Sequence, residues 1–405
     1  MGQFGAPTAV VNATLWGFLE GAGGCEVLGV VGGPQGLLRG ELRPIERLPR
    51  PAGARTGAPR SLGIGARVAA QPGAWLGAGR HRLEDDELDA AVQLLADAGV
   101  EGLALIGGNG TMRLASELHR RAVQGSHPIS IVGLPKTVDN DLEGTDHAPG
   151  FPSAARFLVR TVRDLDLDHR AMTSIEPVRI VETLGRRTGW LALATLTARA
   201  STGGAPHLVY VPERPLNTET FLADVESTVR RHGRALVVVA EGVSGPSIPG
   251  LFDRDAYNRP ISGGVSRALA DLVRDHLGYH ARAEVLGLIQ RCSSDAVSPV
   301  DRREAHAVGV DGARLLRKGE GDIMVGLAPR QPGESAEVTR LTTTPLSEVA
   351  GHTRAVPPAW VPEPAGDAPD LVAWVRPLLG DLTEGWESEE GINAPDHLDT
   401  RETSA

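Results

Sequence analysis

The sequence predicts an α/β fold of two doubly wound lobes, with mainly parallel sheets flanked by helices and an active-site cleft between the lobes. Short apolar runs end in glycine-rich turns and lead into segments of helical periodicity over 101–134, and the alternation recurs over 178–317. A chain of 405 residues is long enough for two such lobes. Ligands of open parallel sheets bind at the carboxyl ends of the strands, so we expect the chemistry there.

The elements of the first half follow from apolar spacing and from glycine. Apolar residues that recur every three or four positions indicate helices, and short apolar runs before glycine indicate buried strands. We expect helices at 8–19, 84–98 and 111–124, strands at 26–31, 101–106 and 129–134, and mostly loop in the Arg-, Gly- and Pro-rich segment 41–79.

The second half repeats this pattern before the composition changes. We assign 1–382 to one two-lobed catalytic domain, with a donor lobe mainly in 1–145, a sugar-phosphate lobe mainly in 146–330, and segments exchanged between the lobes. The remainder, 383–405, is acidic without apolar periodicity, so we expect a disordered tail. Strands are expected at 178–182, 208–211, 235–241 and 284–289, and helices at 188–200, 265–278 and 301–317.

Composition excludes several classes of function. A net charge of −10 argues against a general nucleic-acid-binding protein, which would present a basic face. No apolar run approaches the roughly 18–20 residues that span a bilayer, and the first residues do not resemble a signal peptide. The two cysteines, Cys25 and Cys292, form no disulfide framework and no zinc motif. We therefore expect a cytoplasmic protein that binds neither nucleic acid nor membrane.

The segment 135–141, PKTVDND, carries the strongest chemical signal. It follows the predicted strand ISIVGL and contains one of only two lysines in the chain, the other being Lys318. Lys136 can neutralise charge on a transferring phosphoryl group, and Asp139 can accept a proton from an attacking hydroxyl. Asp141 can hold Mg²⁺ or orient Asp139. The structural alternative is a capped turn, in which the Asp and Asn side chains serve as helix caps.

Two glycine-rich turns offer anion sites. Gly107–Thr111 follows a strand and opens a helix, an arrangement that can bind phosphate, although a strand-to-helix turn needs glycine in any case. The turn around Gly5 near the N-terminus is similar. Arg80, at the end of QPGAWLGAGR, adds a cation.

Other candidates lie at the ends of strands in the second half. Gly185 and Arg186 open the segment GRRTGW and can present a guanidinium group to phosphate, or they are surface residues before a core Trp. Glu241 ends a strand and can accept hydrogen bonds from sugar hydroxyl groups. Arg282, Gln290 and Arg291 flank the run EVLGLI.

Taken in order, these segments resemble the phosphofructokinase family, and most of all its pyrophosphate-dependent branch, diphosphate–fructose-6-phosphate 1-phosphotransferase. The resemblance runs from about residue 2 to about residue 380, and PKTVDND is its most specific motif. It is carried by GAPTAVVNATL, QPGAWLGAGR, GGNGT, PKTVDND, TDHAPGFPSAARF, LGRRTGW, VVAEGV and LGLIQRCSS.

The resemblance implies a role for each matching residue. Asp139 is the implied base for the sugar 1-hydroxyl, with Lys136 and Arg186 as the other catalytic groups, and Asn109 and Asp141 as the metal site for Mg²⁺. The implied substrate-binding residues are Thr137, Val138, Leu184, Gly185, Glu241, Arg282, Leu288, Gln290 and Arg291. The implied donor-phosphate-binding residues are Gly5, Arg80, Gly108, Asn109, Gly110 and Thr111.

Some positions depart from the family pattern. Asn109 stands where the family usually has an Asp for Mg²⁺, and Leu288 where it usually has His or Tyr. Pro177 falls near the place of a phosphate-binding Arg, for which Arg179 is the nearest substitute. The family also has a strand before the first glycines, so either the chain starts further upstream or one edge of the donor lobe is incomplete.

The resemblance implies transfer of a phosphoryl group from pyrophosphate to fructose 6-phosphate by a homodimer or homotetramer. Lys136 favours pyrophosphate as the donor, whereas Gly110 permits ATP because pyrophosphate users often carry Asp there. Two alternatives stay open: an ATP-dependent 6-phosphofructokinase, and a non-catalytic paralogue that binds sugar phosphate.

Overall fold

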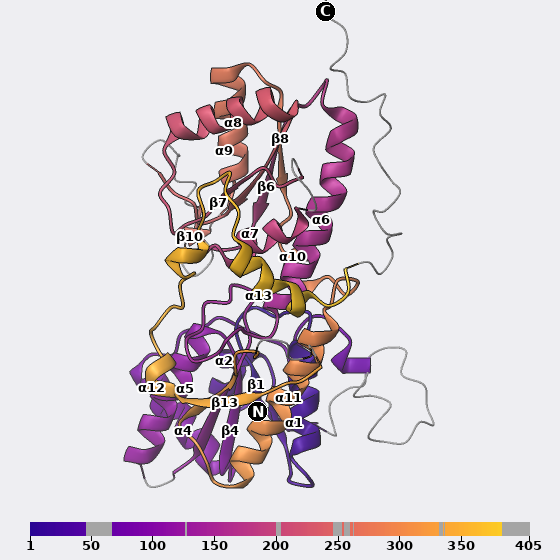
Figure 1. Cartoon of the computed structure of the whole chain (residues 1–405). Helices are drawn as coiled ribbons and strands as arrows, with labels where there is room; N and C mark the ends of the chain where they lie inside the picture. The colour runs from indigo at the N-terminus through magenta and orange to yellow at the C-terminus, as the bar shows by residue number, and fades with distance from the viewer. Residues whose placement is uncertain are drawn as a thin grey trace, which may run out of the picture.

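The computed structural model describes residues 1–45, 67–125, 128–199, 204–245, 253–254, 260–261, 263–331, 335 and 337–382. Two sheets lie in two stacked lobes, each with helices packed against its sheet (Figure 1). The predicted fold class is therefore confirmed. The predicted tail, 383–405, and most of the predicted loop, 46–66, lie outside the described residues. No helix within the described ranges is both long and apolar enough to cross a bilayer.

The first lobe is built on a seven-stranded sheet that is parallel except at its two edge strands. The strands predicted at 26–31, 101–106 and 129–134 are present as β2, β4 and β5. In spatial order the strands are β13 (Leu341–Pro345), β12 (Ile323–Leu327), β5 (Ser130–Pro135), β4 (Gly102–Gly107), β1 (Gly2–Gln3), β2 (Leu28–Val30) and β3 (Leu42–Pro44).

The strand β1 lies between β4 and β2 and is parallel to both. The buried Gln3 amide donates to Asn12 Oδ1 at 2.9 Å and accepts from the Leu76 main-chain N–H at 2.9 Å, so it ties this strand to two neighbouring segments. The first residues therefore form a strand inside the sheet rather than at its edge. Two residues are too few to show the alternation by which a strand is recognised in sequence.

Helices cover both faces of this sheet because successive side chains of β4 point to opposite sides. Leu103 and Leu105 pack with the helices on one face, and Ala104 and Ile106 pack with those on the other. The first group of helices includes α4 (Asp85–Asp97), α5 (Asn109–Gln124) and α12 (Leu346–Val349), with α2 (Gly33–Leu38) packed on α4, and the second comprises α1 (Val11–Gly21) and α11 (Pro299–Arg317).

Two glycines allow α1 and α11 to cross at close range. A Cβ atom on Gly17 would lie 2.0 Å from the carbonyl oxygen of His306, and one on Gly309 would lie 2.1 Å from that of Thr14. Real Cβ atoms do not approach backbone so closely, so each position requires glycine while the helices keep this spacing. Gly17 and Gly309 are 292 positions apart in sequence, yet their helices pack together on one face of the first sheet.

The second lobe is built on a parallel four-stranded sheet, with one large apolar core on its faces. The helix predicted at 188–200 is present as α7 and η2, and the one at 265–278 as α9. The strands are β11 (Ala281–Val285), β6 (Val178–Thr183), β8 (Ala235–Ala240) and β7 (Leu208–Tyr210), and the helices α6 (Phe151–Met172), α7 (Trp190–Ala194), η2 (Thr195–Ala198), α8 (Thr218–His232) and α9 (Val265–Leu277).

The prediction of a strand at 284–289 is wrong for its last four residues, 286–289. The strand β11 begins earlier and ends at Val285, and Ile289–Cys292 forms the short helix α10. Gly287 has φ of +60°, a left-handed conformation that turns the chain out of the sheet. The apolar run misled the prediction because Leu288 and Ile289 are about half exposed rather than buried.

The segment after α11 was not predicted and belongs to both lobes. It adds β12 and β13 to the first sheet, although part of it falls in the range expected for the second lobe. It then passes through η3 (Pro358–Trp360) to α13 (Pro369–Leu379), which packs on α6, α7 and α11 and lies between the two lobes in Figure 1. Asp253–Arg254 (β9) and Pro260–Ile261 (β10) form a small antiparallel pair.

Candidate active site

A cavity of about 1060 Å³ opens where the strands of the two sheets end. Both lobes line it, as the sequence predicted for a ligand cleft in an α/β fold. Its lining comes from segments far apart in the chain: 4–8, 79–84, 108–111, 113–114, 136–139, 186–188 and 351–353, with Pro34, Glu117, Asp141, Leu184, Glu241 and Arg291.

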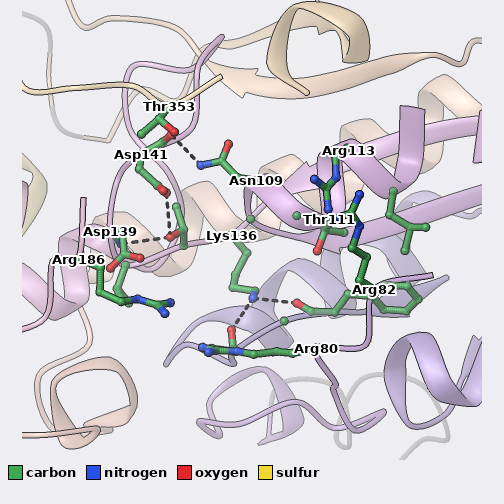
Figure 2. A pocket seen from close by; sticks show the side chains of 18 of the residues that line it. Arg80, Arg82, Asn109, Thr111, Arg113, Lys136, Asp139, Asp141, Arg186 and Thr353 are labelled. Atoms are coloured by element: carbon green, nitrogen blue, oxygen red, sulfur yellow. Dashed lines mark hydrogen bonds between the residues drawn. The ribbon is translucent and has the colours of Figure 1, made fainter. Parts of the chain in front are cut away.

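Lys136 follows the last residue of β5 and points its ammonium group into this cavity (Figure 2). The Nζ atom donates to the carbonyl oxygens of Phe4, at 3.0 Å, and of Ala6. The pKa of Lys136 is lowered to about 7, mainly by burial and then by the charges of Arg80 and Arg291, with Asp139 opposing them. An approaching anion raises the pKa of such a buried amine and favours its protonated form, so Lys136 is suited to bind a phosphoryl group.

Asp139 lies in the same cavity, on the loop after β5. Its main-chain N–H donates to Thr137 Oγ1 at 3.1 Å, and its main-chain carbonyl accepts from Thr188 Oγ1 of the second lobe at 3.2 Å. Burial and then the Asp141 carboxylate raise the pKa of Asp139 to about 6, against the effects of Arg186, Arg80 and Lys136. A carboxylate with a raised pKa is a stronger base than an exposed one, so it is fitted to remove a hydroxyl proton.

The glycine-rich turn between β4 and α5 lies beside Lys136. A Cβ atom on Gly107 would lie 2.0 Å from Thr111 Oγ1, so the turn can be this tight only with glycine. A Cβ atom on Gly110 would meet no atom within 4 Å, so its side faces open space in the cavity. The amide of Asn109 donates from Nδ2 to the Asp141 carbonyl at 2.9 Å and thereby links the turn to the loop after β5.

The residues around Asn109 fit a magnesium ion. The Asn109 Oδ1 atom is buried without a hydrogen-bond partner, and the Asp141 carboxylate raises the pKa of the neighbouring Asp139 carboxyl. Mg²⁺ is bound by oxygen ligands and needs few of them from protein when phosphates supply the rest. The described residues contain no cluster of three His, Cys, Asp or Glu side chains that could hold a metal alone.

Two charged groups of the second lobe face this arrangement. Arg186 Nε lies 3.9 Å from Glu241 Oε1, and both residues line the cavity. Burial raises the pKa of Glu241 to about 7, with Arg186 opposing and Asp139 and Glu182 adding to the rise. The close approach of Gly242 to the Arg186 carbonyl oxygen, which leaves no room for a Cβ atom, holds the two segments together.

Most of the residues singled out in the sequence meet in this cavity, but four do not line it. Arg282 is about half exposed and ion-pairs with Glu176, while the Leu288 side chain is 58% exposed. Gln290 is buried and accepts the Leu184 main-chain N–H at 2.9 Å, so it supports a lining residue from behind. Gly185 lies in the strand-end turn. The roles assigned to these four residues stay predictions.

Arg179, the suggested substitute for a phosphate-binding Arg, is turned away from the cavity. Its side chain is buried and its Nη1 donates to Asp168 Oδ2 at 2.6 Å. It lies opposite Arg282 in the register of β6 and β11, and Glu176 pairs with both. These two guanidinium groups are therefore neutralised by carboxylates within this chain.

Several lining residues were missed. Arg82 lies two positions after Arg80, and Arg113 lies one helical turn after Asn109, so proximity to a motif could have indicated both. Thr188 belongs to the quoted segment LGRRTGW but was not considered by itself. His352 and Thr353, which form the wall beside Asn109, lie in a stretch with no chemical signal in the sequence.

Known proteins show the same pattern of sequence and fold. The family described as Phosphofructokinase matches residues 1–316. The chain is 36% identical to a sulfofructose kinase of Alkalicoccus urumqiensis, over 90% of this chain and 91% of that one. It is 34% identical to a pyrophosphate–fructose 6-phosphate 1-phosphotransferase of Rhodospirillum rubrum, over 77% and 79%. A crystal structure of a pyrophosphate-dependent phosphofructokinase from Marinobacter aquaeolei superposes with a TM-score of 0.79 at 27% identity, over 94% and 90%.

Proposed function

Because this chain belongs to the phosphofructokinase family, we propose that it transfers a phosphoryl group from pyrophosphate to the 1-hydroxyl of fructose 6-phosphate, giving fructose 1,6-bisphosphate. One observation carries the proposal: Lys136 and Asp139 face one cavity, between the glycine-rich turn of one lobe and the Arg186–Glu241 pair of the other. The first lobe then holds the donor and the second lobe the acceptor.

The chemical step needs a base and a positive environment in the right places. Asp139 takes the proton of the 1-hydroxyl as its oxygen bonds to phosphorus, and the bridging bond of the donor breaks. Lys136 and Arg80 spread the charge of the transferring group, and Arg186 orients the acceptor. Mg²⁺ held near Asn109 and Asp141 would neutralise donor oxygens. Phosphoryl transfer asks little covalent chemistry of the protein, so positioning and electrostatics supply most of the rate.

Lys136 supports pyrophosphate as the donor. Its ammonium is placed by the Phe4 and Ala6 carbonyl oxygens, so its position does not depend on a nucleotide. The open space around Gly110 supports the alternative, ATP, because no side chain narrows the cavity there. Gly110→Asp should therefore abolish any ATP use, and an unchanged ATP rate would contradict this steric account.

A specific observation favours a second acceptor, sulfofructose. Of the two arginines expected to bind the acceptor, Arg291 lines the cavity, whereas Arg282 forms an ion pair with Glu176. A sulfonate carries one negative charge and needs fewer cations than a phosphate dianion. The 36% identity to a sulfofructose kinase over most of both chains agrees with this acceptor.

The test is a two-by-two assay of the purified protein with both donors and both acceptors. Release of the sugar bisphosphate, or of the phosphorylated sulfosugar, should be fastest with pyrophosphate and fructose 6-phosphate. A preference for the sulfosugar would select the second acceptor, and a preference for ATP would replace the donor. No turnover in any combination, with sugar phosphate bound, would indicate the non-catalytic paralogue. Gel filtration would test the proposed homodimer or homotetramer.

A further inference from the structure

We propose that the donor end of the cavity binds linear inorganic oligophosphates longer than pyrophosphate, with Arg82 and Arg113 contacting the third phosphate. Both residues line the same cavity as Lys136 and Asp139. Arg82 comes from the segment before α4, and Arg113 comes from the second turn of α5. Figure 2 shows both directed to the end of the cavity beside Thr111, on the side of Lys136 opposite to Asp139. The proposal rests on the proposed phosphoryl transfer.

The order of polar groups along the cavity sets the length of the donor. A phosphoryl group that is about to be transferred must lie between Lys136 and the acceptor near Asp139. The next phosphate of the donor then lies over the turn 108–111, where main-chain N–H groups at a helix start favour anions. Arg82 and Arg113 lie on the side of Lys136 away from Asp139, where a third phosphate would follow (Figure 2). Gly110 leaves the path between them open.

The two guanidinium groups at this end are not held in strong ion pairs within the described residues. Arg113 Nε is 3.9 Å from Glu117 Oε1, and both side chains are more than one third exposed, so their attraction is weak. The carboxylates of Glu84 and Glu87 are occupied by the capping box of α4, and Glu87 also bonds His81 at 2.9 Å. Guanidinium groups bind phosphate oxygens in a bidentate manner, and two of them converge here. A nucleobase would instead need an apolar slot.

The reaction with such a donor is balanced without further reactants. With tripolyphosphate, the acceptor oxygen forms a bond to the terminal phosphorus, and the bond from that phosphorus to its bridging oxygen breaks. Pyrophosphate leaves, and the hydroxyl proton passes to Asp139. No electron transfer occurs, and the pyrophosphate released can serve as a donor in a second turnover.

Binding provides the decisive test, since it does not depend on turnover. Isothermal titration of the full-length protein with tripolyphosphate and with pyrophosphate, at fixed free Mg²⁺, should show about tenfold tighter binding of tripolyphosphate, as two added guanidinium contacts predict. The double variant R82Q/R113Q should bring the ratio of the two affinities close to one. R120Q, an exposed residue of the same helix outside the cavity lining, is the matched control and should keep the ratio.

The inference fails if the wild type binds both anions equally, or if the ratio survives in the double variant. If the double variant does not fold, as judged by circular dichroism, R113Q alone should lower the ratio at least threefold. ATP that binds more tightly than tripolyphosphate, with the excess lost in R82Q/R113Q, would overturn the inference in favour of a nucleoside. Turnover separates the two proposals. If the protein does not turn over pyrophosphate but still binds tripolyphosphate more tightly than pyrophosphate, only the assignment of the donor is refuted.

Discussion

Replacing Lys136 by Met should remove activity without removing stability. The ammonium group is 3% exposed, and its pKa falls from 10.5 to about 7, which corresponds to a cost of about 5 kcal/mol for keeping the charge buried below pH 7. Met fills a similar volume and removes this cost. Against it, two buried carbonyl groups lose their donor, at roughly 1–3 kcal/mol each. The free energy of unfolding should therefore stay level or rise by about 1–3 kcal/mol.

The sign of the pH dependence follows from the lowered pKa of Lys136. Below pH 7 both the folded and the unfolded chains carry the proton, so the folded state bears the full cost of the buried charge. The cost shrinks as the pH rises from the folded pKa toward the unfolded one. The stability advantage of K136M over the wild type should thus fall by about 2–3 kcal/mol between pH 6 and pH 9.

Urea unfolding at both pH values measures the stability, and the two-donor assay measures activity. Loss of the cation at the transferring phosphoryl group should lower kcat/KM about 100- to 1,000-fold. The control is K318M, because Lys318 is the other lysine of the chain and is exposed beside Glu320. A strongly destabilised K136M, or one that keeps more than about a tenth of wild-type kcat/KM, would refute the reasoning.

Further predictions concern the base, its support, the donor turn and the helix crossing. Asp139→Asn should abolish transfer while sugar-phosphate affinity by titration stays within about threefold, and a tenth of wild-type turnover would rule out its role as base. Thr188→Val removes the hydrogen bond to the Asp139 carbonyl and should lower kcat roughly tenfold at constant melting temperature, with rescue by Ser. Gly110→Asp should abolish any ATP use while pyrophosphate use persists, as competing-donor assays would show. Gly309→Ala should destabilise the fold by about 3 kcal/mol or more in urea, and an unchanged midpoint would contradict the close crossing.

The sequence predicted those parts of the site that follow directly from strand ends. Lys136 and Asn109 come one and two residues after the last residues of β5 and β4, and parallel neighbouring strands bring their carboxyl ends together, so both were expected in one place. Arg282 was expected there because it flanks the same apolar run as Arg291. It lies at the opposite end of β11, however, where it pairs with Glu176.

The errors in the predicted elements have local causes. The strand β1 has only two residues, and its membership in the sheet depends on the partners on either side rather than on its own pattern. The left-handed conformation of Gly287 turns the chain out of the sheet, although the apolar residues after Gly287 suggested that the strand continues. The wall formed by His352 and Thr353 depends on Arg354, whose main-chain N–H donates to the Asp141 carbonyl and whose guanidinium stacks on Trp190 at 4.4 Å. Such tertiary contacts have no counterpart in residue spacing.

The path of the chain between the lobes has a mechanical consequence. The described chain passes from one lobe to the other between β5 and α6, between α10 and α11, and between α12 and η3, and α13 is wedged at the junction. A body joined by a single linker can rotate about many axes, whereas three crossings confine any hinge rotation to an axis that passes near all of them. Closure of the cavity around a phosphoanhydride would then have to bend all three crossings together.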